Sequence, residues 1–322
     1  GRTRNPWKVD AGSSGSSAGP ASATAGGLVG FAIGSETLGS ISSPSTVCGT
    51  TGLRPTYGRV PKTGAMALSW SMDKLGPICR SAEDCALVLD AIHGPDGHDK
   101  SAIAASFNYD ATLSPKKLRI GYVKSAFDLP ILDPKDEKRT LHGSKKWDDA
   151  ALEVLKGMGI DLIPVDLPDL PYDAMRIILT AEAAAAFDDL TRSNRDGELV
   201  QQSRFDWANT FRTARFIPAV DYINANRVRS NTIEAWGEMM KKFDVIVTPT
   251  SAANLAQLVA TNLTGHPAVI LPNGFRPDGT PVSLTFLGGL FEEGKLLAVA
   301  NAYQRATGFN KVHPAIPPTP AK

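Results

Sequence analysis

Short apolar segments of strand length alternate along this chain with longer amphipathic segments of helical length. The alternation is typical of an α/β protein, because buried strands read as brief hydrophobic runs while covering helices repeat every three to four residues. We therefore expect a mixed, twisted central sheet flanked by helices on both faces. The expected strands span residues 28–33, 118–123, 160–165, 245–248, 268–271 and 282–287, and the expected helices span 82–93, 136–158, 174–192, 218–242 and 292–307.

Neither a linker nor an internal repeat divides the 322 residues, so we expect a single domain over residues 1–322. Few periodic apolar positions occur at 95–115, which predicts a long surface excursion. The stretch 314–322 contains four prolines and predicts a disordered tail.

Composition excludes several classes of function. The formal charge is +1 and 42% of the residues are hydrophobic, so the chain is neither disordered nor equipped with a basic stripe for nucleic acid. The long uncharged stretch 11–35 consists mostly of Gly, Ser and Ala and does not qualify as a membrane span. Three scattered cysteines give no disulfide framework and no zinc motif, and Cys48 and Cys85 read as small buried side chains rather than nucleophiles.

A serine- and glycine-rich segment at 12–45 is the main candidate for a functional site. A flexible linker has this composition, but this segment runs directly into the apolar run 28–33 and then into a second tight cluster at 34–40. Glycines allow consecutive backbone N–H groups to converge on one point, as stabilising a carbonyl oxyanion requires. Ser40 follows Gly39 in the loop after the expected strand and is therefore a candidate nucleophile that still needs a base.

The motifs in and after this segment form a long and specific pattern. The chain resembles the amidase signature family over both ends, while the middle, about 125–240, has diverged. The residues that carry the resemblance are GSSGSSAG at 12–19, GSETLGSI at 34–41, CGTTGLRPTYGRV at 48–60, SMDKLGP at 71–77, RSAED at 80–84, TPT at 248–250, NLTGHPA at 262–268, and the stretch 272–288.

The resemblance implies a serine hydrolase with a Ser, cis-Ser, Lys triad and no metal or organic cofactor. By the family's spacing Ser40 is the nucleophile and Ser16, preceded by a cis peptide bond, is the bridging serine. The backbone amides of Thr37, Leu38, Gly39 and Ser40 then form the oxyanion hole. The expected substrate is a small-molecule carboxamide, ester or carbamate, with no nucleic-acid or membrane partner; a homodimer is one option for assembly, and the cytoplasm is the default compartment.

Several positions depart from the family pattern. In the family the catalytic Lys lies several dozen residues before the serine loop. We therefore expect this Lys to be absent from the chain and the chain to be an N-terminally shortened form. Lys8 lies at a position where the family needs no base. The alternatives are a non-catalytic relative, or an amidotransferase A-type subunit that releases ammonia to a partner. Ser42 replaces the usual arginine, so the local ion pair with Glu36 is expected to be absent, and Leu38 replaces one of two paired glycines.

Competing hypotheses use the same residues differently. Ser17 lies in a Gly-x-Ser-x-Gly pattern typical of α/β-hydrolases, but no strand precedes it. Of the histidines, only His266 is expected near a pocket, whereas His93, His98, His142 and His313 are expected to be solvated, and no metal-ligand spacing occurs. Asp73 is expected to support the serine loop by hydrogen bonding. Aromatic residues that could line an acyl pocket are Trp70, Phe187, Phe205, Trp207 and Phe211.

Overall fold

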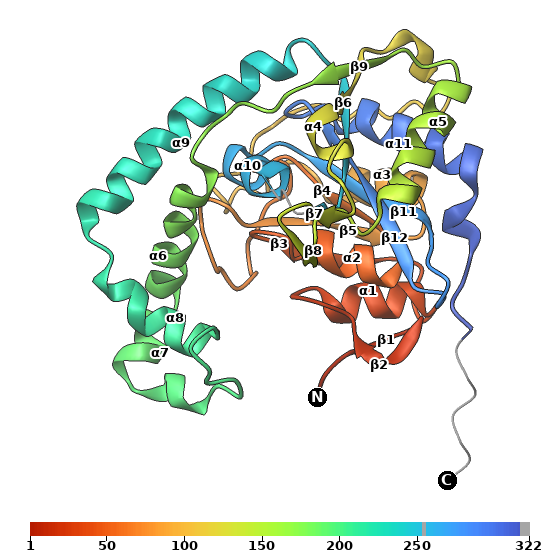
Figure 1. Ribbon diagram of the computed structural model, residues 1–322. Coiled ribbons are helices and arrows are strands. Elements are labelled where there is room, and N and C mark those ends of the chain that lie inside the picture. Colours follow the sequence, from red (N-terminus) through yellow and green to blue (C-terminus); the bar gives the residue numbers. More distant parts are fainter. Residues whose placement is uncertain (253–255, 316–322) are drawn as a thin grey trace.

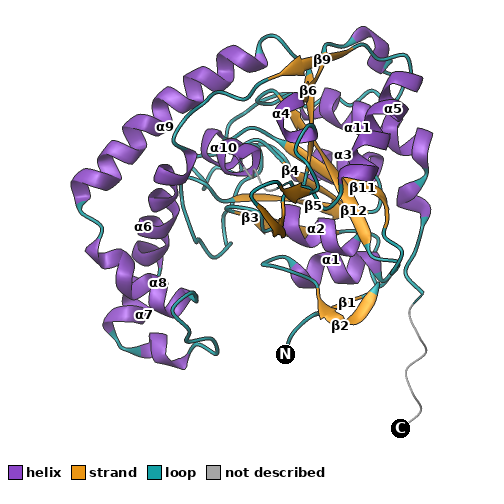
Figure 2. Ribbon diagram, viewed as in Figure 1, coloured by secondary structure: helices purple, strands orange, loops and turns teal. Residues whose placement is uncertain are grey.

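The computed structural model describes residues 1–252 and 256–315 of the chain. Within these residues a mixed sheet of eight strands forms the centre of the molecule (Figures 1 and 2). Its order is β3 (Ala32–Glu36), β5 (Lys74–Cys79), β4 (Thr51–Arg54), β11 (Ala268–Phe275), β12 (Pro281–Gly288), β10 (Val245–Pro249), β6 (Ile120–Val123) and β9 (Leu162–Val165). Neighbours are antiparallel from β3 to β10 and parallel from β10 to β9.

Both faces of the sheet are buried, because successive side chains of a strand point to opposite sides. Val245 and Val247 of β10 pack into one hydrophobic cluster with residues of α3, α5 and α11, whereas Ile246 between them packs into a second cluster with residues of α6, α9 and α10. A smaller third cluster joins α1 and α2 to β5. The sheet therefore lies between two helical layers, which confirms the expected fold class.

Figure 1 labels the α-helices that surround the sheet, numbered in chain order. They are α1 (Ala18–Ala25), α2 (Ser42–Cys48), α3 (Ala82–Ile92), α4 (Lys124–Phe127), α5 (Lys145–Gly157), α6 (Ile177–Ala186), α7 (Asp188–Arg192), α8 (Trp207–Thr213), α9 (Ala219–Met240), α10 (Ala256–Thr264) and α11 (Glu293–Thr307). Short 3₁₀ helices lie at Pro115–Lys117, Tyr172–Arg176, Arg195–Glu198, Ala214–Phe216 and Phe309–Lys311. Two hairpins, β1 (Arg4–Asn5) with β2 (Lys8–Gly12) and β7 (Leu132–Asp133) with β8 (Asp136–Thr140), lie outside the main sheet.

The structure differs from the expected elements in three places. The helix expected at 136–158 begins only at Lys145, because Asp136–Thr140 forms the fully exposed strand β8. The strand expected at 28–33 is shifted to Ala32–Glu36, and Leu28 is left 79% exposed. Strands β4 and β5 were not expected from the sequence at all.

Other expectations are confirmed. The helix expected at 82–93 is α3 (Ala82–Ile92), and at its N-cap the Ser81 hydroxyl accepts a hydrogen bond from the Asp84 backbone N–H. Residues 95–114 contain neither helix nor strand. Most of the expected tail, 316–322, lies outside the described residues. In the part of the chain that is described, no helix combines the length and apolarity needed to cross a bilayer.

Candidate active site

The loop after strand β3 holds the candidate nucleophile in a defined position. Glu36 ends β3 and its buried carboxylate reaches over the loop, where Oε2 accepts hydrogen bonds from the backbone N–H groups of Ile41 at 2.9 Å and Ser42 at 2.8 Å, and from the Ser42 hydroxyl at 2.8 Å. Oε1 accepts from Arg54 Nη1 at 2.9 Å and Asn262 Nδ2 at 2.8 Å. One carboxylate thus fixes both the start of α2 and the chain around residues 37–40.

The charge of Glu36 is compensated from strand β4. Burial by itself raises the pKa of Glu36, but the charge of Arg54 and hydrogen bonds from Arg54, Asn262 and Ser42 outweigh it and lower the pKa to about 2. The expected absence of an ion pair between Glu36 and position 42 is confirmed, and Arg54 supplies the cation instead, which the sequence did not predict. Nη2 of Arg54 also donates to the Thr261 hydroxyl at 2.6 Å and to the His266 carbonyl at 3.2 Å.

The segment with the candidate bridging serine lies directly against this loop. The peptide bond Gly15–Ser16 is cis, and the next backbone N–H, that of Ser17, donates to the Ser40 carbonyl at 3.1 Å. The Ser17 hydroxyl itself donates to the Ser35 carbonyl and accepts from the Ser35 N–H, both at 3.1 Å. Ser17 is thus a buried structural residue that ties the two segments together, which argues against a nucleophile elbow at this position.

Thr37 and Gly39 shape the loop between the two anchors. The Thr37 hydroxyl donates to Asp73 Oδ1 at 2.5 Å, and Asp73 Oδ2 accepts from the backbone N–H groups of Leu68 and Ser69. The supporting role expected for Asp73 is confirmed. Gly39 has φ +99°, a conformation that favours glycine, and a side chain there would meet Ser43 at 3.4 Å and Leu258 at 3.5 Å.

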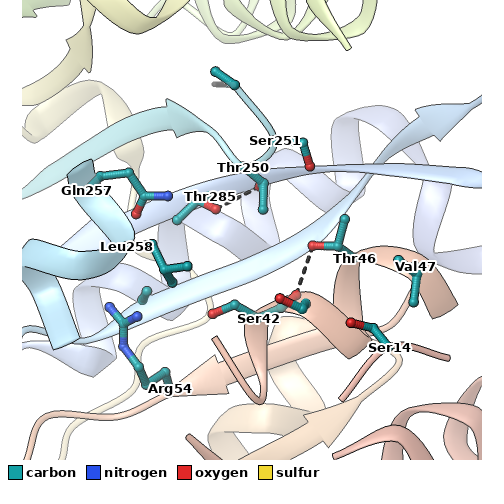
Figure 3. A pocket seen from close by; sticks show the side chains of 13 residues that line it. Ser14, Ser42, Thr46, Val47, Arg54, Thr250, Ser251, Gln257, Leu258 and Thr285 are labelled. Carbon is teal, nitrogen blue, oxygen red and sulfur yellow. Dashed lines mark hydrogen bonds between the residues drawn. The ribbon is translucent and has the colours of Figure 1, made fainter. Parts of the chain in front are cut away.

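Two cavities flank these segments. The first, which we call the hydroxyl pocket, has a volume of about 430 Å³ and lies between α2, α10 and the end of β10 (Figure 3). It is lined by Ser14, Ser42, Ser43, Thr46, Val47, Arg54, Thr250, Ser251, Ala252, Gln257, Leu258, Ala268 and Thr285. This cavity was not predicted from the sequence.

The second cavity, which we call the aromatic cavity, has a volume of about 900 Å³ and lies on the side of Ser16, Ser17 and Thr37. Its far wall includes Trp70, Phe187, Trp207 and Phe211, with the rings of Phe187 and Phe211 stacked at 4.9 Å between centroids. Four of the five aromatic residues expected to line a pocket therefore meet in one cavity. The fifth, Phe205, does not line it and is 79% exposed.

The remaining candidate residues do not come together with the serines. His142, expected to be solvated, is fully buried and its Nε2 lies 2.8 Å from Asp148 Oδ2. His266 is buried next to the Thr264 hydroxyl, and burial together with the charge of Arg54 lowers its pKa to about 4. Burial raises the pKa of the Cys48 thiol to about 11, so it is not poised as a thiolate. In the described residues no group of His, Cys, Asp and Glu is placed to hold a metal ion.

The contacts of Lys8 and Lys74 bear on whether either lysine can act as a general base. Nζ of Lys8 lies 3.4 Å from Asp278 in an exposed ion pair. Lys74, which the sequence did not single out, is 2% exposed and faces Glu36 across the β3–β5 pair, and its Nζ donates to the Asn262 carbonyl at 3.5 Å. Burial, and then the charge of Arg54, lowers the pKa of Lys74 well below its usual range.

Comparison with known proteins places this geometry in a family. The amidase family model matches residues 1–297. The chain belongs to the amidase signature family. The A subunit of glutamyl-tRNA(Gln) amidotransferase from Acinetobacter baumannii strain AB0057 is 32% identical over 98% of this chain and 71% of the relative, and that from Bacillus velezensis is also 32% identical with the same coverage.

Solved amidase signature enzymes share the fold. The peptide amidase of Stenotrophomonas maltophilia superimposes with a TM-score of 0.77 at 29% identity, over 99% of this chain and 70% of that one. The corresponding amidotransferase chain from Thermotoga maritima gives a TM-score of 0.78 at 24% identity, over 98% and 72% of the two chains. The resemblance seen in the motifs is thereby confirmed, and these relatives place the chain among enzymes of amide carbon–nitrogen bonds.

Proposed function

We propose that this chain cleaves a carboxamide C–N bond through an acyl-enzyme on Ser40. The observation that carries the proposal is the contact between the two serine segments: the peptide bond before Ser16 is cis, and the N–H that follows, on Ser17, donates to the Ser40 carbonyl. Ser40 Oγ attacks the substrate carbonyl carbon and its proton passes through the Ser16 hydroxyl to a neutral lysine. The tetrahedral intermediate then collapses, the protonated amine or ammonia leaves, and water hydrolyses the acyl ester.

The loop 37–40 supplies the electrostatic part of this mechanism. Backbone amides of Thr37, Leu38, Gly39 and Ser40 are the proposed donors to the oxyanion, and the contacts of Glu36 and Asp73 hold that loop at both ends. Fixed donors stabilise a developing charge because they need no reorganisation during the reaction, and each contributes on the order of 3 kcal/mol. Esters and carbamates can be cleaved by the same steps.

The general base in this proposal is a neutral lysine, and neither Lys8 nor Lys74 makes a hydrogen bond to a serine hydroxyl of the site. Lys8 pairs with Asp278 at the surface, which makes it a poor candidate. Burial and the charge of Arg54 lower the pKa of Lys74, but its Nζ donates to the Asn262 carbonyl rather than to a serine hydroxyl. Burial near the serine network favours the neutral form that any such lysine needs.

A second candidate function is favoured by the curated relatives. Those at 30–32% identity are named as the A subunit of glutamyl-tRNA(Gln) amidotransferase, so they work within a complex. On this hypothesis the same Ser40 chemistry releases ammonia from an amide donor and delivers it to a partner protein rather than to water. The bond broken is the same, and only the fate of the ammonia differs. A non-catalytic relative that keeps the fold is the remaining alternative.

The test uses the protein expressed from its complete gene, together with Ser40→Ala and, as the control, Ser230→Ala, an exposed residue of α9. Hydrolysis of simple aryl amides and esters that is lost in Ser40→Ala and retained in Ser230→Ala supports the amidase. Slow amide hydrolysis that rises only when partner proteins are added, with a stable complex in pull-down, supports the amidotransferase hypothesis. Turnover unchanged in Ser40→Ala contradicts both, and no turnover of any substrate supports the non-catalytic relative.

A further inference from the structure

The hydroxyl pocket lies immediately next to the loop that carries Ser40. Its wall includes Ser42 and Ser43, which follow the nucleophile in α2, and Ser14, which precedes the cis peptide bond. Leu258 of α10 lies on the same wall and stands within contact distance of the position a Gly39 side chain would take. Figure 3 shows Ser14, Ser42 and Leu258 on its wall, so this cavity is bounded by immediate neighbours of Ser40 and of the cis peptide bond.

The described residues of this wall offer no unpaired positive charge to an anionic ligand. Among the described lining residues only Arg54 is charged, and its guanidinium already pairs with Glu36 at 2.9 Å. Nη2 of Arg54 donates to the Thr261 hydroxyl and the His266 carbonyl, and its Nε, which has no hydrogen-bond partner among the described residues, is buried and not accessible to a ligand in the cavity. Bringing a carboxylate into such a site costs its hydration and returns no new ion pair.

Most hydroxyl groups on the wall already donate within the protein. The Ser42 hydroxyl donates to Glu36, the Thr46 hydroxyl donates to the Ser42 carbonyl at 2.8 Å, and the hydroxyls of Thr250 and Thr285 lie 2.7 Å apart. These bonds fix the shape of the pocket and leave few donors there for a ligand.

Gln257 is different from its neighbours. It is only 4% exposed, yet its side-chain amide makes no hydrogen bond to any described residue, and Figure 3 shows the amide directed from α10 into the cavity. The amide atoms of Gln257 are not among the fully enclosed unpartnered atoms, so they remain accessible from the cavity and are free to bind a ligand's polar atoms. A carboxamide side chain offers one acceptor and two donors, and another uncharged amide matches both.

We propose that the hydroxyl pocket is the acyl subsite and that Gln257 is its specificity-determining residue, selecting acyl groups that carry an uncharged carboxamide over isosteric carboxylates. This inference rests on the proposed function, since it takes Ser40 as the nucleophile. A cavity of about 430 Å³ accommodates a short acyl chain of this kind. The apolar wall formed by Val47, Leu258 and Ala268 packs against the methylene groups of that chain.

The experiment compares three 4-nitroanilides of nearly equal shape: the succinamoyl compound with a terminal carboxamide, the succinyl compound with a carboxylate, and the 4-methylpentanoyl compound with an apolar end. Each is assayed with the protein expressed from its complete gene and with Gln257→Met, which keeps side-chain length and removes the amide. Gln201→Leu is the matched control, because Gln201 is an exposed residue away from the pocket. Thermal unfolding checks that each variant is folded.

We expect kcat/KM to favour the carboxamide over the carboxylate. Gln257→Met should lower kcat/KM for the carboxamide compound by about tenfold, mainly through KM, and leave the 4-methylpentanoyl compound unchanged. A preference for the carboxylate, or an equal loss on all three compounds, overturns the inference.

Calorimetric binding to Ser40→Ala separates this inference from the proposed function. Tight binding of the carboxamide compound that is lost when Gln257→Met is added supports the subsite even if no turnover is found, and that outcome counts against the amidase only. Turnover that depends on Ser40 but not on Gln257 overturns the subsite and leaves the amidase standing.

Discussion

Removing the charge of Glu36 is the perturbation whose effect the structure defines best. Glu36→Gln keeps the shape of the side chain but leaves the guanidinium of Arg54, 1% exposed, without its ion-pair partner. Breaking a buried pair in this way costs about 3 to 5 kcal/mol, because an uncompensated charge stays in the interior. An amide also has one acceptor oxygen where the carboxylate has two, so the bonds to Ile41, Ser42, Arg54 and Asn262 cannot all be kept.

The same residue predicts a pH dependence with a definite sign. The pKa of Glu36 is about 2 in the folded protein and 4.5 for the free side chain, so the folded state favours the ionised form. This difference corresponds to about 3 kcal/mol of stability, which is fully present above pH 4.5 and is lost as the pH falls from 4.5 toward 2. The gap between wild type and Glu36→Gln should therefore be widest near neutral pH and should narrow in acid.

The assay is urea unfolding followed by circular dichroism at a series of pH values, with Glu137→Gln as the control. Glu137 is an exposed residue of β8, and its substitution should leave the free energy of unfolding nearly unchanged. The reasoning is refuted if Glu36→Gln loses less than about 1 kcal/mol at neutral pH, or if its deficit is the same at every pH.

Three further substitutions give independent tests. Lys74→Met should raise the free energy of unfolding at neutral pH, because burial lowers the pKa of Lys74 and penalises its charged form, and the gain should shrink as the pH rises toward 10.5. Activity should persist in this variant, because Nζ of Lys74 donates to the Asn262 carbonyl rather than to a serine hydroxyl. Abolished turnover in a folded variant contradicts that assignment. Asp73→Asn should lower kcat by about tenfold with little change in KM, because the Thr37 hydroxyl in the oxyanion loop then loses its hydrogen bond to a carboxylate. An altered KM with unchanged kcat contradicts this role. Burial and the charge of Arg54 favour neutral His266, so the wild type should lose about 3 kcal/mol of stability as the pH falls from 6.5 to 4. His266→Gln should abolish that loss. An unchanged pH profile of urea unfolding in the variant disproves it.

The sequence predicted the fold class and the serine loop well, because both follow from local patterns. Alternating apolar runs indicate buried strands wherever a strand is long and continuous, as in Val245–Pro249 and Pro281–Gly288. Hairpin strand β8 and the buried state of His142 were missed, because the residues at 136–140 are polar, and tertiary pairing with β7, Asp148 and Ala252 holds this segment in place. Burial that depends on long-range partners leaves no periodic signal in the chain.

The polar anchors of the site were predicted only in part for the same reason. Asp73 could be inferred as a support because it stands in a motif next to the loop in the family pattern. Arg54 and Gln257 are ordinary residues of a strand and a helix, and their roles depend on tertiary contacts with Glu36 and with an open cavity. Glu182 of α6, which accepts from the hydroxyls of Ser69 and Ser71, likewise gave no sign in the diverged middle of the chain.

The most direct test of the central claim is to locate the acyl or phosphonyl group that the enzyme itself attaches. The protein expressed from its complete gene is treated with a fluorophosphonate, and tryptic peptides are analysed by mass spectrometry. The account predicts one modified residue, Ser40, with labelling abolished in Ser40→Ala, strongly slowed in Ser16→Ala and unaffected in Ser230→Ala, an exposed residue of α9. Labelling that persists in Ser40→Ala at the same rate, or an adduct found on another serine, contradicts it.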